Sequence, residues 1–419
     1  MRIQRVDAIL LSYPLPVPLH LTYYGGNRTI FKRDAMLIRI ETDNGIIGYA
    51  PGQASETAHL AINGPIATFL TGRTLADVDA LRVQFLALGP DAEKSFKYYA
   101  TVEIALYDAL GKHLGLPVSE LLGGRVRDRI KLYGSGGMYM PPEGYAREAK
   151  AVADRGFPAY KMRPGMGPDQ DIEAVRLIRE AVGPDIDIMV DAHTWWRMGN
   201  RSYDPLAVER IAAQLAEYDI YWLEEPVRPD DHDALRNLRN SEVVPIATGE
   251  HEPSDEGFKD LIARHCADFI QADIVCQGGY ASARKIFRML EDENLRFAFH
   301  SWGTELEVAA AAQIGICYSE ATVEWLEYPC HRYPGNAENP ERDGMYPFDL
   351  AWEIVKTKPK IENGDYVVAS APGLGVEIDE SVITRYPWIP GPWSRFELID
   401  PPGSFAVTGD HTQKWDDIK

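Results

Sequence analysis

Seven polar residues end successive apolar, β-branched runs, at intervals close to one strand plus one helix. The steps between consecutive members are 30, 33, 26, 23, 27 and 27 residues. In a (β/α)8 barrel the carboxyl ends of successive strands converge on one face, so this spacing would gather all seven side chains in one pocket. Their chemistry indicates a metal ion and proton transfer. The seven are Lys161, Asp191, Glu224, Glu250, Asp273, His300 and Glu327.

Three of the carboxylates lie at the ends of consecutive expected strands and predict a magnesium site. Asp191, Glu224 and Glu250 each follow directly on an apolar run. Magnesium prefers hard oxygen ligands, whereas zinc prefers His and Cys, which do not occupy these three strand ends. Glu225 adjoins Glu224, but strand alternation points it to the other side, so only one of the two should bind the metal. We expect that ligand to be Glu224.

Two cations accompany the acids. Lys161 and Arg163 are two residues apart and therefore face the same side of their strand. We expect them to hold an anionic oxygen and to balance the acids, which leaves a metal-loaded pocket net positive and suited to a carboxylate substrate. Glu327 would meet that carboxylate. We expect Glu327 to be protonated and to donate a hydrogen bond, its pKa raised by the neighbouring negative charge.

Two histidines supply candidate proton-transfer groups. His193 follows Asp191 by two residues and shares its inward face. His300 lies one strand beyond Asp273, and an aspartate on a neighbouring strand can fix the imidazole tautomer and raise its basicity. An imidazole with a pKa near the working pH is an effective general base.

Distal parts of a substrate should be read by loops of a second domain and by residues after His193. The candidates lie in a Gly-containing stretch between two expected strands, and packing of its aromatic residues against the barrel rim is the alternative interpretation. They are Tyr23, Tyr24, Asn27 and Arg28, with Trp195 at the barrel mouth.

The elements that must position these residues alternate between strand and helix. Residues 1–128 have strands first, near 3–13 and 35–42, then a helix near 95–113, which indicates an α+β domain. Residues 129–350 contain eight β-rich runs separated mostly by amphipathic helical stretches, which predicts a parallel barrel. The runs lie near 130–133, 159–162, 186–190, 220–223, 245–248, 269–273, 297–299 and 323–326. Residues 351–419 return to short strands and turns and could pack on the first domain.

Composition excludes several function classes. The chain has 419 residues, 45% of them hydrophobic and 25% charged, enough for a barrel plus a second domain. A net charge of −20 with scattered Lys and Arg argues against a nucleic acid or an anionic membrane as partner. No segment approaches the ~20 apolar residues of a membrane helix, and we expect a cytoplasmic protein. The four cysteines lack CxxC spacing and are expected to be buried thiols.

These pieces together resemble the mandelate racemase branch of the enolase superfamily over nearly the whole chain. The matching motifs are KMR at 161–163, VDAH at 190–193, WLEEP at 222–226, TGE at 248–250, Asp273 with Gly278-Gly279, His300, and WLE at 325–327. The resemblance implies a (β/α)7β barrel under an α+β cap formed by the N-terminal domain and part of the C-terminus. It also implies Asp191, Glu224 and Glu250 as Mg²⁺ ligands, Asp273–His300 as a catalytic dyad, and a homo-oligomer.

Arg163 departs from the racemase pattern. Racemase-like members carry a second lysine here as a base, whereas arginine stays charged at working pH. One base, His300, and an added imidazole, His193, remain, in an arrangement that resembles the galactonate and mannonate dehydratases. We therefore expect removal of an α-proton by His300, protonation of the leaving 3-hydroxyl by His193, and a 2-keto-3-deoxy acid as product. Lys161 is the alternative base.

A hexonate or pentonate aldonate is the expected substrate, of undetermined stereochemistry. A racemase or epimerase, or a cycloisomerase of the same superfamily, is the alternative within the family. A non-catalytic binding barrel is the alternative from a different class.

Overall fold

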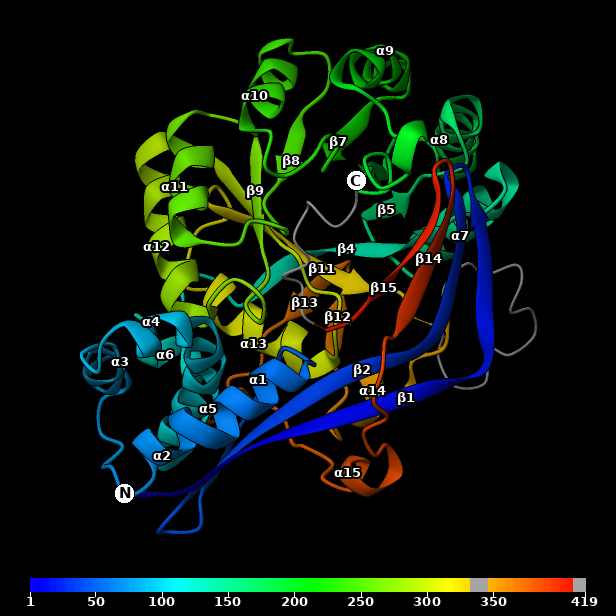
Figure 1. The fold of residues 1–419 in the computed structure, drawn as a ribbon. Coiled ribbons are helices and arrows are strands. Elements are labelled where there is room, and N and C mark those ends of the chain that lie inside the picture. The colour runs from blue at the N-terminus through cyan, green and yellow to red at the C-terminus, as the bar shows by residue number, and fades with distance from the viewer. Residues whose placement is uncertain (332–345, 410–419) are drawn as a thin grey trace.

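The computed structural model describes residues 1–331 and 346–409, and its centre is a closed barrel of eight parallel strands. The last strand pairs with the first, Glu327 opposite Tyr133, which closes the barrel. Each strand falls on one of the eight predicted β-rich runs, so the expected barrel is confirmed (Figure 1). The strands are β4 (Arg129–Met138), β5 (Ala159–Arg163), β6 (Asp187–Asp191), β7 (Ile220–Glu224), β8 (Ile246–Thr248), β9 (Phe269–Ala272), β10 (Arg296–Phe299) and β11 (Val323–Pro329).

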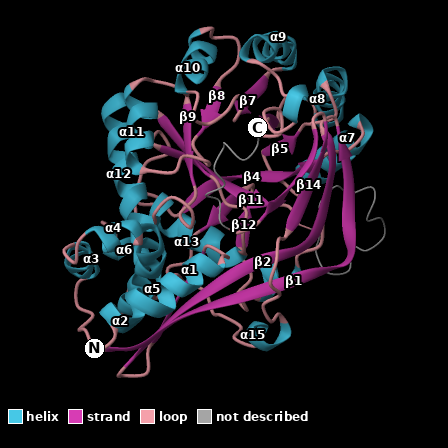
Figure 2. Ribbon diagram, in the orientation of Figure 1, coloured by secondary structure: helices cyan, strands magenta, loops and turns pink. Residues whose placement is uncertain are grey.

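Seven helices alternate with these strands and form the outer ring, as Figure 2 shows. Several begin at built-in start signals: the side chains of Asp204, Asp231 and Ser254 each accept a hydrogen bond from a backbone N–H in the first turn. The seven are α7 (Pro142–Asp154), α8 (Pro168–Val182), α9 (Pro205–Leu215), α10 (His232–Asn240), α11 (Asp255–Ala263), α12 (Gly279–Glu293) and α13 (Glu305–Gly315).

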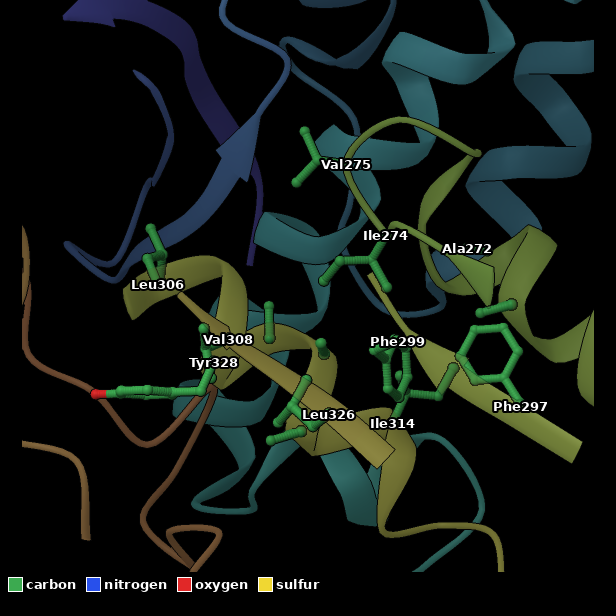
Figure 3. Packing of buried hydrophobic residues seen from close by; sticks show 14 of the residues in the cluster. Ala272, Ile274, Val275, Phe297, Phe299, Leu306, Val308, Ile314, Leu326 and Tyr328 are labelled. Atoms are coloured by element: carbon green, nitrogen blue, oxygen red, sulfur yellow. The ribbon is translucent and has the colours of Figure 1, made fainter. Parts of the chain in front are cut away.

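An apolar layer joins the barrel strands to their helices. Figure 3 shows Phe297 and Phe299 of β10 beside Ile314 of α13 and Leu326 of β11. All four side chains are fully buried. Because burial of such side chains contributes roughly 1.5–3 kcal/mol each, this packing helps to hold strands β10 and β11 in place, and with them His300, which follows β10, and Glu327, which lies within β11.

The cap is built on a long antiparallel hairpin with helices at one end. Strand β1 (Ile3–Tyr23) pairs with β2 (Gly26–Thr42), and β3 (Ile47–Gly52) pairs with the other edge of β2 near its end. Helix α5 (Phe96–Leu114) packs on this sheet and is almost wholly buried. The smaller helices are α1 (Glu56–Ala61), α2 (Ala67–Leu70), α3 (Val78–Leu86), α4 (Pro90–Lys94) and α6 (Val118–Leu121).

The C-terminal part of the chain returns to both units. Strand β14 (Ser394–Ile399) pairs with β2 of the cap and with β15 (Pro402–Val407) (Figure 1). The hairpin of β12 (Lys360–Glu362) and β13 (Asp365–Val367) pairs with β4 of the barrel. Two short helices, α14 (Asp349–Glu353) and α15 (Val382–Arg385), complete the segment. The domain limits expected at residues 128 and 350 stay a prediction.

One expectation about the cap is wrong. The connection between the two strands is shorter than expected: only Tyr24 and Gly25 form the turn, because β1 continues to Tyr23 and β2 begins at Gly26. Asn27 and Arg28 therefore lie on a strand, paired with Glu397 and Phe396. Among the described residues, no helix has the length and apolar character needed to cross a membrane.

Candidate active site

Strand alternation explains why the predicted residues converge. One residue of each barrel strand belongs to an aromatic and apolar layer that fills the interior; the rings of Tyr133 and Trp222, three strands apart, are 5.4 Å from each other. Side chains two residues apart share a face of a strand. Two residues beyond Ala159, Met189, Trp222, Ala298 and Trp325 stand Lys161, Asp191, Glu224, His300 and Glu327. These five therefore form the next layer toward the carboxyl ends of the strands.

Asp191 of this layer and two residues beside it bring ligand atoms close enough to share a metal ion. Ligand atoms of Asp191, His193 and Glu250 all lie within 4.8 Å of one another. Asp191 Oδ2 and Glu250 Oε2 are buried and accept no well-aligned hydrogen bond from the described residues, although Arg163 Nε and His300 Nε2 lie 3.1 Å from them as charged neighbours. Buried carboxylate oxygens without hydrogen bonds are costly, so the donor set fits a hard divalent cation.

Glu224, the third expected ligand, is placed differently. Its Oε1 lies 2.7 Å from Lys161 Nζ, and its Oε2 accepts a hydrogen bond of 3.0 Å from Trp222 Nε1. Burial raises the pKa of Glu224 to about 8 despite Lys161, and the charges of Asp191 and neighbouring carboxylates add to the rise. Its role as a ligand stays a prediction. Glu225 turns away to accept from Thr248 and Gly249, as strand alternation requires.

Lys161 lies below the open part of the site. It is fully buried and lies 2.7 Å from Glu224 and 3.0 Å from Glu327, with Asp191 at 3.8 Å. Burial opposes its charge, but these carboxylates outweigh burial and raise the pKa of Lys161. Lys161 is not among the residues that line the cavity described below.

Arg163 reaches the cavity and bridges two acids. Its Nε lies 3.1 Å from Asp191 and its Nη2 lies 3.2 Å from Glu327. The guanidinium carbon lies 3.8 Å from the centre of the Trp302 ring. Burial opposes the charge, yet Asp191 and Glu327 raise the pKa of Arg163, which keeps it cationic.

The protonation expected of Glu327 depends on a bound carboxylate and stays a prediction; the described groups by themselves act in the opposite direction. Burial alone would raise its pKa, but Lys161, His300 and Arg163 outweigh burial and hold the pKa of Glu327 below its ordinary value. Glu327 is therefore a charged acceptor. Its Oε2 also accepts from the backbone N–H of Ser301, 2.9 Å away.

Two histidines are each held by an aspartate through Nδ1. The His300 Nδ1–Asp273 Oδ2 distance is 2.9 Å, and the His193 Nδ1–Asp191 Oδ1 distance is 2.8 Å. His300 Nε2 also lies 3.1 Å from Glu250. Burial lowers the pKa of His300, but Glu250, Glu327 and Asp273 outweigh burial and raise it to about 10. Glu250 makes the largest of these three contributions to the raised pKa, and a cation bound at Glu250 would weaken it.

A cavity of about 190 Å³ lies between this layer and the cap. Of the predicted residues, Arg163, Asp191, His193, Glu250, Asp273 and His300 line it. Glu224, Glu327 and Lys161 belong to the same layer of side chains but are not among the residues that line the cavity.

Of the five predicted substrate contacts, only Arg28 lines the cavity. Tyr23 stacks on Tyr139 instead, and Tyr24 is 41% exposed. The Asn27 side chain is exposed and accepts from Thr22, and the buried Trp195 donates to Asp171.

Sequence reasoning missed several residues that line the cavity. Arg33 comes from β2, and Trp393 and Phe396 come from the C-terminal segment, whose turn-rich composition gave no signal for a wall of the site. Arg197 was not missed: it lines the cavity, as expected of the residues that follow His193. Arg197 and His251 come from loops after β6 and β8, and Arg197 Nη2 lies 2.6 Å from His251 Nε2. His251 directly follows Glu250 in sequence, and this was the one signal available.

Two family models cover most of the chain. Residues 8–123 match the mandelate racemase/muconate lactonizing enzyme N-terminal domain, and residues 144–382 match the enolase C-terminal domain-like family. The chain belongs to the enolase superfamily, in its mandelate racemase branch.

Known members of the superfamily similar to this chain carry out different reactions. D-xylonate dehydratase of Haloferax volcanii is 28% identical, with 84% of this chain and 85% of the relative covered. N-succinyl-L-Arg/Lys racemase of Bacillus cereus is 25% identical, with 91% and 97% covered. The structure of 3,6-anhydro-D-galactonate cycloisomerase from Zobellia galactanivorans has a TM-score of 0.75 at 28% identity, with 92% and 99% covered. The reaction must therefore be argued from the site.

Proposed function

We propose that this member of the superfamily is a magnesium-dependent acid-sugar dehydratase. The observation that supports it best is the pairing of two histidines with two aspartates, His300–Asp273 and His193–Asp191, around one cavity that also contains Arg163. Elimination of water needs one group to take a proton and another to give one. The similarity to a D-xylonate dehydratase is consistent with this reaction.

In the proposed reaction His300 takes the proton from the carbon next to the carboxylate. The electrons of that C–H bond form a double bond between C2 and C3 as the C3–oxygen bond breaks. His193 gives its proton to the leaving hydroxyl, which departs as water, and the enol product rearranges to a 2-keto-3-deoxy acid. Arg163 holds the carboxylate. A Mg²⁺ ion held by Asp191, Glu224 and Glu250 would stabilise the negative charge that develops on that carboxylate.

Geometry favours His300 over Lys161 as the base. His300 lines the cavity, whereas Lys161 lies below it with carboxylates on several sides. A base must come within hydrogen-bond reach of the proton it removes. Lys161 instead forms ion pairs with Glu224 and Glu327 and thereby holds these two side chains in position beneath the cavity.

Arg163 argues against the two alternatives within the superfamily. A racemase that works from both faces needs a second base, and a guanidinium held by Asp191 and Glu327 keeps its proton. A cycloisomerase with two lysine bases is disfavoured for the same reason, because Arg163 cannot act as a second base.

The test is a screen of a stereochemically complete set of aldonates and aldarates, with Mg²⁺, for formation of 2-keto acids. In deuterated water His300→Asn should lower both α-proton exchange and water loss by about 10²–10⁴-fold. His265→Asn is the matched control, because His265 pairs with Glu293 on the surface. Exchange without water loss would contradict a dehydratase, and wild-type rates in His300→Asn would contradict the base assignment. Water loss that survives chelation of Mg²⁺ would contradict the metal.

A further inference from the structure

Two buried arginines line the cap side of the cavity. Arg28 and Arg33 both belong to β2 and are only 5% and 7% exposed. Their guanidinium carbons lie 5.0 and 4.7 Å from the centre of the same ring, Trp393. Two cations thus lie close together against one aromatic side chain.

Neither arginine has an acidic partner within 4.0 Å among the residues that the structure describes. Arg28 Nε donates to Ser394 Oγ at 2.9 Å, and Nη1 donates to the sulfur of Met138. Arg33 Nη2 donates to the Trp302 carbonyl at 2.9 Å, while its buried Nε has no partner in the described part of the chain. Burial lowers the pKa of Arg28; Tyr139, which also hydrogen-bonds to it, and Tyr346 oppose this effect, and the like charge of Arg33 adds to it.

Asp34 and Asp191, which also line the cavity, pair with residues other than Arg28 and Arg33. Asp34, next to Arg33 in sequence, lies 3.1 Å from Lys32 and accepts from Ser12 at 2.7 Å. Asp191 is held by His193 and Arg163 in the barrel layer. Apart from Asp34, which pairs with Lys32, the carboxylates that line the cavity belong to the barrel, while Arg28 and Arg33 place positive charge without an ion pair at the cap.

Burying a cation without a counter-charge is costly, so a pair that faces a cavity indicates an anion that supplies the missing charge. The carboxylate next to the reacting carbon is already accounted for by Arg163. We propose that Arg28 and Arg33 bind a second carboxylate at the other end of the substrate, so that the substrate is a sugar diacid, an aldarate, and not the aldonate expected from sequence. This inference rests on the proposed dehydratase function and names its substrate class.

The stacking of these side chains suits a carboxylate. Arg28 lies against Phe396 as well as Trp393, and Arg33 against Tyr346 and Phe348. Aromatic faces hold a guanidinium group in one plane, and its parallel N–H groups match the two oxygens of a carboxylate. A distal hydroxyl would leave both charges uncompensated.

The experiment compares diacids and monoacids of the same stereochemistry, such as galactarate with galactonate and glucarate with gluconate, in the presence of Mg²⁺. For the stereochemistry that reacts, kcat/KM of the diacid should exceed that of the monoacid by about 100-fold or more. Arg28→Met and Arg33→Met should each reduce this ratio at least about tenfold, mainly through KM of the diacid.

Arg39→Met is the matched control, since Arg39 also lies on β2 but pairs with Glu380 outside the cavity. The ratio should be unchanged in this variant. If the methionine variants fail to fold, Arg33→Lys is the alternative. It keeps the positive charge but loses the parallel N–H groups of the guanidinium, and it should still reduce the ratio of diacid to monoacid kcat/KM.

A binding measurement separates failure of this inference from failure of the proposed function. Adipate and hexanoate have equal length, lack hydroxyls and cannot lose water. Adipate should raise the Tm of the Mg²⁺-loaded protein more than hexanoate, and Arg33→Met should abolish the difference. If no sugar acid loses water but this difference is found, only the dehydratase proposal fails. Preference for a monoacid or a phosphorylated aldonate, or ratios unchanged in Arg28→Met and Arg33→Met, would overturn the inference.

Discussion

At the scale of single residues, the site is a set of charges whose partners decide their roles. Asp191 contacts His193 and Arg163, whereas Glu224 contacts Lys161 and Trp222. Sequence pattern placed both acids as magnesium ligands. The structure groups Asp191 with Glu250 and His193 instead, so Glu224 and His193 are the two residues whose roles most need separating.

Mg²⁺ binding in the absence of substrate separates them. If Glu224 is a ligand and His193 a proton donor, Glu224→Gln should weaken Mg²⁺ binding at least about tenfold, as loss of a charged oxygen ligand would. His193→Asn should bind Mg²⁺ within about threefold of wild type but lose water elimination. Calorimetric titration gives both affinities. A large loss in His193→Asn with none in Glu224→Gln would assign the imidazole, and not Glu224, to the metal.

At the scale of elements, the sequence predicted the site residues whose positions follow from regular strand alternation. It missed residues whose positions depend on irregularities in a strand. Lys161, Asp191 and Glu327 were found because each lies two residues beyond an interior residue of a regular strand. Arg33 was missed because it lies between the candidate stretch that ends at Arg28 and the strand expected at 35–42. It also lies five positions after Arg28, and a regular strand would place the two on opposite faces. The pairing of β1 with β2 shifts register between Ile30 and Lys32, and both arginines line the cavity.

The first turn of α13 joins the barrel to the C-terminal segment through a buried acid. Glu305 is 2% exposed and accepts hydrogen bonds from Tyr328 Oη of β11 at 3.2 Å and Tyr366 Oη of β13 at 3.0 Å. Burial raises the pKa of Glu305 from 4.5 to about 8, although both tyrosines oppose the rise. The folded state therefore retains this proton at pH values at which the unfolded chain has lost it.

The sign of the pH dependence follows. Between the unfolded pKa of 4.5 and the folded value of about 8, the folded protein binds more protons, so Glu305 makes the free energy of unfolding fall as pH rises. The slope is at most about 1.4 kcal/mol per pH unit. Denaturant unfolding from pH 5 to 8 should show a shallower fall in Glu305→Gln, whereas exposed Glu256→Gln should follow wild type. Equal slopes in all three proteins would contradict the buried proton.

At the scale of the whole molecule, cap and barrel each supply one side of the cavity. The barrel contributes the residues proposed to bind metal and transfer protons, and the cap sheet contributes Arg28 and Arg33 with Trp393 and Phe396, in or next to β14. Under the two proposals, chemistry and substrate selection belong to separate units, and a change confined to the cap sheet should alter one without the other.

Gly26 tests this separation, because β14 lies directly against it. A Cβ on Gly26 would lie 1.9 Å from the backbone oxygen of Glu397, so Gly26→Ala must displace β14 and with it Phe396. Overpacking of this kind costs about 1–3 kcal/mol. Gly26→Ala should lower Tm and raise KM at least about fivefold, yet leave Mg²⁺ affinity unchanged because the carboxylates belong to the barrel. In Gly403→Ala, where the added Cβ meets nothing within 4 Å, all three quantities should match wild type. A lowered Tm with unchanged KM would show that β14 stabilises the cap without positioning the arginines, and the aromatic support inferred for Arg28 would have to be abandoned.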